Sequence, residues 1–89
     1  MSEPYRVLVP PSVAKEIKKF PTEGRKSVFH AISRLSENPR PPGYVKLKIS
    51  DLGEYRLRAG TFRVRYDVDD ENREVHILAV KPRDRAYRI

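Results

Sequence analysis

Arginines recur at every second residue in two neighbouring segments in the last third of the chain. Arg56 and Arg58 are separated by one residue, as are Arg63 and Arg65. Because a β-strand sends alternate side chains to opposite faces, each pair shares one face of its strand. Gly60 lies between the segments at a position typical of a turn, so the pattern predicts a β-hairpin. If both pairs lie on the same side, four guanidinium groups line a surface suited to a polyanion.

The basic side chains are concentrated rather than spread along the 89 residues. The net charge is +7 at pH 7. Residues 40–65 hold seven basic and two acidic side chains, residues 81–88 hold four and one, and the remainder holds eight and nine. A local excess of this kind attracts nucleic acid. The alternative is a solvated sheet face on which arginines serve solubility, but solubility does not require such segregation.

The apolar spacing predicts one α+β domain over residues 1–89. Ser12 is expected to cap the first helix, and the prolines and glycine of 38–43 end the second. Two helices can then cover one face of a small, mainly antiparallel sheet and leave the other face basic and open. The segment near 74–81 is apolar on both faces apart from His76, which predicts a central strand. In chain order, the expected elements are a strand over 5–10, helices over 12–20 and 22–37, and strands near 54–59, 62–69 and 74–81, giving β-α-α-β-β-β.

Several kinds of site are excluded by composition. The chain has no cysteine, so a disulfide, a thiolate metal site and a cysteine nucleophile are all absent. His30 is expected on a helix surface and His76 partly buried in the sheet. The acidic residues of 67–71 read as a polar turn, with a spacing unlike a calcium loop. We therefore expect no metal and no cofactor.

The sequence also favours a cytoplasmic protein that does not enter a membrane. The longest apolar run is the four residues 77–80, far too short to span a bilayer. Residues 1–5 lack the basic and apolar regions of a signal peptide.

The remaining polar groups, chiefly arginine, lysine and tyrosine, are sufficient to cleave RNA. RNA carries its own nucleophile in the ribose 2′-hydroxyl. A protein need only align that oxygen with the phosphorus and neutralise the charge that develops. An arginine fork matches the non-bridging phosphate oxygens, and an aromatic ring can stack on a base.

Two segments carry a resemblance to a known family: Gly60-Thr-Phe-Arg63-Val-Arg-Tyr66-Asp-Val and Val75-His-Ile-Leu-Ala-Val-Lys81-Pro-Arg83-Asp-Arg85-Ala-Tyr87-Arg. They resemble the RelE branch of the RelE/ParE toxin superfamily. The element order agrees over essentially the whole chain. The resemblance implies a RelE-like microbial RNase fold and the toxin of a type II toxin–antitoxin pair. Such a toxin is a metal-independent, ribosome-dependent endoribonuclease that cuts mRNA in the ribosomal A site, leaving a 2′,3′-cyclic phosphate and a 5′-hydroxyl.

The same resemblance implies three catalytic residues. Arg63 matches the arginine that stabilises the phosphate, and Arg83 matches a candidate general acid for the leaving oxygen. Tyr87 matches the C-terminal tyrosine that orients or helps to activate the reacting nucleotide. Two of them have other readings: Tyr87 could close the hydrophobic core, and Arg83 could hold ribosomal RNA away from the scissile bond.

The general base is where this chain departs from the family. The best-known members carry two lysines where this chain has Arg56 and Arg58, and guanidinium does not release its proton. Lys46 or Lys48 could supply the base from the preceding loop, or the enzyme could act by positioning and electrostatics. The side chains expected to bind RNA or the ribosome are Lys46, Lys48, Arg56, Arg58, Arg65, Lys81, Arg85 and Arg88.

The expected partners follow from the resemblance. They are a RelB-like antitoxin, the ribosomal A site with its rRNA, and mRNA. The toxin alone is expected to be monomeric and the toxin–antitoxin complex to be of higher order. Two other functions stay open: a ParE-like inhibitor of DNA gyrase, and a non-catalytic RNA- or ribosome-binding module.

Overall fold

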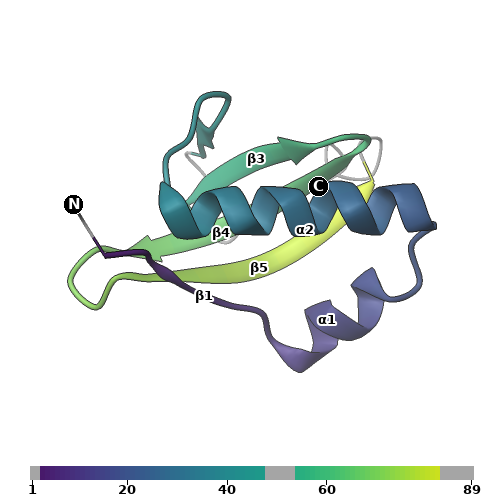
Figure 1. Ribbon diagram of the computed structural model, residues 1–89, viewed down its shortest axis with the longest axis horizontal. Coiled ribbons are helices and arrows are strands. Elements are labelled where there is room, and N and C mark those ends of the chain that lie inside the picture. The colour runs from purple at the N-terminus through teal and green to yellow at the C-terminus, as the bar shows by residue number, and fades with distance from the viewer. Residues whose placement is uncertain (1–2, 48–53, 83–89) are drawn as a thin grey trace.

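The computed structural model describes residues 3–47 and 54–82. These residues form a five-stranded sheet and two helices with their connecting turns (Figure 1). The sheet order is β1-β5-β4-β3-β2. β1 runs parallel to β5, and the other neighbouring strands are antiparallel. The α+β class with a mainly antiparallel sheet is confirmed. The elements are β1 (Arg6–Leu8), α1 (Pro11–Ile17), α2 (Thr22–Glu37), β2 (Val45–Lys46), β3 (Tyr55–Ala59), β4 (Phe62–Asp69) and β5 (Glu74–Pro82).

The longer helix, α2, forms one layer of the core by lying across the sheet (Figure 1). Val28 and Leu35 are fully buried at helical spacing, and Ala31 fills the turn between them. They join a core that includes Val64 and Tyr66 of β4. Burying a side chain of this size typically contributes about 1.5–3 kcal/mol, so this stripe fixes α2 on one face of the sheet.

The shorter helix, α1, begins earlier and ends earlier than the sequence predicts. Pro10 is its N-cap residue and makes no side-chain capping hydrogen bond, so the expected cap at Ser12 is wrong. Pro11 suits the first position because its missing N–H would have no partner within the helix. The helix ends at Ile17, and the ring of Phe20 lies beyond it, stacked on Phe62 with centroids 4.2 Å apart.

The apolar pattern of β5 has a cause that the sequence does not reveal. β5 lies between β1 and β4, so it is an interior strand, but the middle strand of the sheet is β4. Its register against β4 shifts between Arg65 and Tyr66. Ile77 is buried before the irregularity and Val80 after it, whereas Leu78 is 46% exposed. The apolar residues on both faces therefore reflect a bulge that changes the alternation, not two buried faces.

The β3–β4 hairpin agrees with the prediction from the sequence. Strand β2 is not part of that prediction. Gly60 occupies the turn with φ of 64°, a left-handed conformation that glycine adopts without strain. β2 is an additional strand of two residues at the sheet edge, and it includes Lys46, which the sequence places in a loop. A two-residue strand is too short to show alternation. Among the described residues, no helix is long and apolar enough to cross a membrane.

Candidate functional site

The hairpin register places four arginines on one face of the sheet. Arg56 is paired with Arg65, and Arg58 with Arg63. Residues directly opposite in an antiparallel ladder share a face, so the expected common surface is confirmed. Lys81 of β5 lies opposite Arg63 and extends the row to a third strand. We call the face that carries these side chains the open face, since α2 packs on the other one.

Arg63 is almost fully buried within this surface. It is 6% exposed, and its Nη1 donates a hydrogen bond of 3.5 Å to the carbonyl oxygen of Phe62. It lines a recess of about 170 Å³, and among the described residues it is the one charged side chain that is buried. We call this the arginine recess; its lining residues are Gly43, Val45, Arg56, Arg58 and Arg63.

The arrangement concentrates positive charge in a site that is partly withdrawn from water. Guanidinium groups stay protonated, so the charge persists at any physiological pH. Like charges directly opposite one another destabilise a sheet. An anion placed near the pairs Arg56–Arg65 and Arg58–Arg63 would interact favourably with the guanidinium groups of both pairs. An anion in the recess would interact more strongly than in bulk water, because the effective dielectric constant is lower there.

The two described lysines of the predicted binding set occupy different surroundings. Lys46 is opposite Tyr55 in the β2–β3 ladder, so it lies on the face away from the arginines. Val45 takes the place beside Arg56 instead and forms a wall of the recess. Lys81 forms an ion pair with Glu16 of α1, with Nζ and Oε1 3.0 Å apart.

Arg40, part of the basic segment at 40–65, is used to hold the fold together. Its guanidinium donates to both carboxylate oxygens of Asp70, at 3.1 and 2.9 Å, and to the hydroxyl of Tyr55. The hydroxyl of Tyr5 donates to the same carboxylate at 2.7 Å. These hydrogen bonds, chiefly from Arg40, lower the pKa of Asp70 to about 2. Arg40 therefore contributes less to the basic surface than the count of charges suggests.

The other predicted side chains lie outside the described residues. They include two of the three expected catalytic groups, Arg83 and Tyr87. The expected binding residues that also lie outside the described residues are Lys48, Arg85 and Arg88. The walls of the recess at Gly43 and Val45 were not anticipated, and the only sequence signal for them is a proline-rich turn ahead of a strand.

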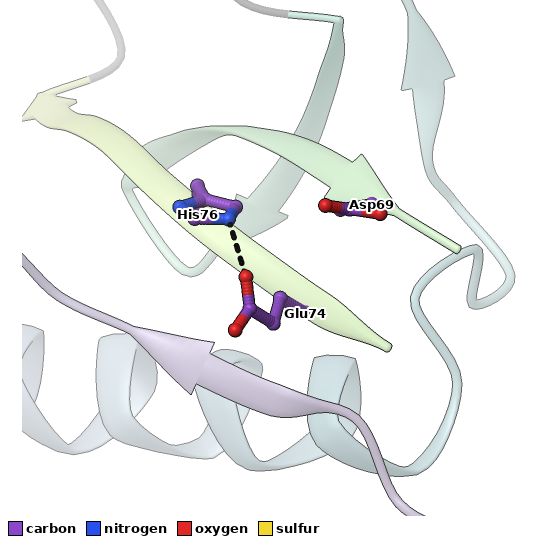
Figure 2. Close-up of side chains that lie close together, drawn as sticks. All are labelled: Asp69, Glu74 and His76. Carbon is purple, nitrogen blue, oxygen red and sulfur yellow. Dashed lines mark hydrogen bonds and ion pairs between the residues drawn. The ribbon is translucent and has the colours of Figure 1, made fainter. Parts of the chain in front are cut away.

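The far end of the open face is acidic. Asp69 of β4 and Glu74 and His76 of β5 bring ligand-capable atoms within 4.8 Å of one another (Figure 2). His76 Nε2 is 3.1 Å from Glu74 Oε1, and Glu74 is also ion-paired with Arg6. The hydrogen bond from Arg6 lowers the pKa of Glu74, and the hydrogen bond from the Asn72 side chain lowers that of Asp69. Neighbouring protein groups thus account for the cluster. Both histidines are placed as the sequence predicts: His30 is exposed on α2, and His76 is partly buried in β5.

Comparison with known proteins gives consistent matches. Residues 7–87 match the family described as the ParE toxin of the type II toxin–antitoxin system parDE. A candidate RelE1 toxin of Methanocaldococcus jannaschii is 33% identical over 87 residues, covering 94% of this chain and 96% of the relative. A chain of the archaeal RelE–RelB complex from Pyrococcus horikoshii is 29% identical with a TM-score of 0.78, covering 91% of this chain and 97% of that one. A chain of the RelBE2 toxin–antitoxin complex from Mycobacterium tuberculosis is 30% identical with a TM-score of 0.77, covering 90% and 99%.

Fold, site and sequence matches define the class together. The chain belongs to the ParE toxin family of type II toxin–antitoxin systems, within the RelE/ParE superfamily. Its close matches in sequence and structure carry RelE names, so within that superfamily it is a toxin of the RelE type.

Proposed function

We propose that this toxin is a ribosome-dependent endoribonuclease that cuts mRNA in the ribosomal A site and so stops translation. The observation that carries the proposal is Arg63, a buried guanidinium in the arginine recess. A charge held in this way is preorganised toward a bound anion and needs little rearrangement when negative charge develops. A phosphodiester is the anion that a row of arginine forks fits best.

The reaction needs only groups that RNA, water and this chain provide. The ribose 2′-hydroxyl loses its proton to water and its oxygen attacks the adjacent phosphorus, forming the 2′,3′-cyclic phosphate. The bond from phosphorus to the 5′-oxygen breaks, and that oxygen takes up a proton to leave as a 5′-hydroxyl. In this scheme Arg63 neutralises the non-bridging oxygens, Arg83 stabilises the negative charge on the leaving 5′-oxygen while water supplies its proton, and Tyr87 orients the nucleotide. The step uses no metal ion.

Positioning and electrostatics are proposed to supply most of the rate enhancement. Among the described residues, no lysine lines the arginine recess. Lys46 lies on the other face of the β2–β3 ladder, which makes it a poor candidate for the general base. Arg56 and Arg58 line the recess but do not release protons. Aligning the 2′-oxygen for in-line attack can by itself remove a large part of the barrier.

A RelB-like antitoxin is the proposed cellular partner. Two of the structural relatives are toxin–antitoxin complexes, RelE–RelB and RelBE2. A ribosome-dependent nuclease made without control would stop the growth of its host. An acidic, largely disordered antitoxin that folds across the basic face would neutralise this toxin by masking Arg56, Arg58 and Arg63.

Inhibition of DNA gyrase is a second candidate, because the matching family is described by its ParE members. Two assays on the same toxin distinguish the two functions. Induction of the toxin in growing cells, followed by mapping of mRNA 5′ ends, should reveal cuts in phase with codons that vanish when translation is blocked. A purified gyrase supercoiling assay with the same toxin should be unaffected. Inhibited supercoiling with no new 5′ ends would contradict the nuclease and support the gyrase alternative.

A further inference from the structure

A second basic hollow lies next to the arginine recess. It is a groove of about 430 Å³ between α2 and β3, and the residues that line it include Lys26, His30, Arg34 and Arg58. The three residues from α2 are spaced four apart, so each lies about 6 Å along the helix axis from the next and all share one face. We call this hollow the α2–β3 groove.

The groove and the proposed active site share one charged side chain. Arg58 lines both the α2–β3 groove and the arginine recess. Its Nε donates a hydrogen bond of 3.3 Å to the carbonyl oxygen of Gly60, which anchors the side chain at the sheet edge. A guanidinium has five N–H donors, so this single bond leaves donors for a ligand. A chain of phosphates leaving the recess would therefore meet the groove next.

The lining favours a phosphate backbone over a protein segment. The apolar residues that line the groove are Ala31 and Ala59, which are 2% and 4% exposed. An amphipathic protein segment needs apolar pockets for its anchor residues, and these two alanines offer little surface. Among the residues that line the groove, none is acidic. Arg34 is held by a 3.2 Å hydrogen bond from its Nη2 to the carbonyl oxygen of Pro42 and so presents its charge from a fixed position.

We infer that the α2–β3 groove is a second anion-binding site, which holds the sugar–phosphate backbone of the RNA whose scissile phosphate lies in the arginine recess. The inference rests on the proposed function. It adds a binding surface on α2, a part of the chain to which the sequence gives no role in RNA recognition. The site recognises charge and not base identity, so it contributes affinity and register but no sequence preference.

The test is the salt dependence of binding to a short fluorescent 2′-O-methyl RNA, which lacks the free nucleophile and stays intact. Lys26→Ala/Arg34→Ala removes two charges from the groove. Lys15→Ala/Lys19→Ala removes two charges from exposed positions on and just beyond α1 and is the matched control. Because Arg34 also holds the Pro42 carbonyl, thermal unfolding of each variant is measured, and Lys26→Ala alone serves as a second variant.

The groove pair should lower the slope of log K against log salt by about 1.4, and Lys26→Ala alone by about 0.7, since each phosphate contact on a single strand contributes about 0.7. The control pair should leave the slope nearly unchanged. Equal losses for the groove and control pairs would overturn the inference by showing diffuse attraction only.

Two further outcomes separate this inference from the proposed function. If Arg63→Ala weakens RNA binding and the groove pair does not, the groove fails while the proposed function stands. If the wild type does not bind the free RNA, the inference fails, whereas the proposed function, which requires the ribosome, is decided separately by the mapping of mRNA 5′ ends. Groove variants that keep full RNA affinity but no longer bind the co-expressed antitoxin would assign the groove to the antitoxin and overturn the inference.

Discussion

Arg63 combines three properties that a surface arginine kept for solubility would not need together. It is buried, it lies directly opposite Arg58, and it lines a recess whose other charged walls are also arginines. A bound anion stabilises an arrangement of this kind, because it supplies opposite charge in a site that is partly withdrawn from water. At the scale of single residues, the site is therefore suited to an anionic ligand.

Replacement of this side chain should affect chemistry far more than folding. Arg63→Ala should lower the single-turnover rate of cleavage on programmed ribosomes by about 10²–10³-fold, the usual effect of losing one preorganised donor to a developing negative charge. Arg63→Lys should restore part of the rate, since it keeps the charge but loses the fork. Lys19→Ala, which removes a charge outside the recess, is the control. Arg63→Ala cleaving at the wild-type rate would remove it from the mechanism.

The β3–β4 hairpin sets the geometry of the site at the scale of elements, and it is also the part that the sequence predicts best. A period of two on either side of Gly60 is local information, and it determines which side chains share a face. The two-residue strand β2 and the bulge opposite Arg65 could not be predicted in this way. Each depends on a neighbouring strand that is distant in sequence.

Contacts between distant segments limit the prediction of individual site residues for the same reason. Arg40 appears in the sequence as one more basic residue, and its use by Asp70 is visible only once the fold joins them. Lys46 lies on the face away from the arginines because β2 pairs with β3. The catalytic roles of Arg83 and Tyr87 rest on the family resemblance. Both residues lie outside the described part of the chain, so the structure does not test these roles.

The turn at Gly60 offers a test of the geometry of the β3–β4 hairpin. A Cβ at residue 60 would lie 2.9 Å from the hydroxyl oxygen of Ser27, and the backbone there has φ of 64°. Gly60→Ala should lower the free energy of unfolding by about 1–2 kcal/mol from the left-handed conformation alone, with the contact adding to it. Gly43→Ala, at φ of 96° with nothing within 4 Å, carries backbone strain without the contact. Urea unfolding should show this loss for Gly60→Ala, and an unchanged free energy of unfolding would contradict the turn geometry.

The open face is divided at the scale of the whole molecule into a basic and an acidic half. The arginine recess lies towards the β3–β4 turn, whereas Asp69, Glu74 and His76 lie towards the β4–β5 turn. Asp70 closes the acidic end, where its carboxylate joins Tyr5 near the N-terminus to Arg40 beyond α2. In the proposed function, this separation would direct a polyanion to the basic half of the face, while the acidic half has a structural role.

The junction at Asp70 predicts a specific dependence of stability on pH. Its pKa is about 2 in the folded protein, below the ordinary value of about 3.9. A lowered pKa adds stability that is complete above the unfolded-state value and is lost as pH falls from about 4 to about 2. The difference in free energy of unfolding between wild type and Asp70→Asn should be constant above about pH 5 and shrink below pH 4. Denaturant unfolding at several pH values measures it, and a difference that stays constant down to pH 2 would show that Asp70 is not ion-paired in solution.

The claim that this toxin uses the nucleophile of its own substrate is tested most directly on ribosomes programmed with two mRNAs. One carries a normal ribose at the scissile nucleotide in the A site, and the other carries 2′-deoxyribose at that position. The account predicts rapid cleavage of the first, with a 2′,3′-cyclic phosphate detected by mass spectrometry on the upstream fragment, and no cleavage of the second. Cleavage of the deoxy substrate would contradict the account, because its phosphodiester has no 2′-hydroxyl to attack it.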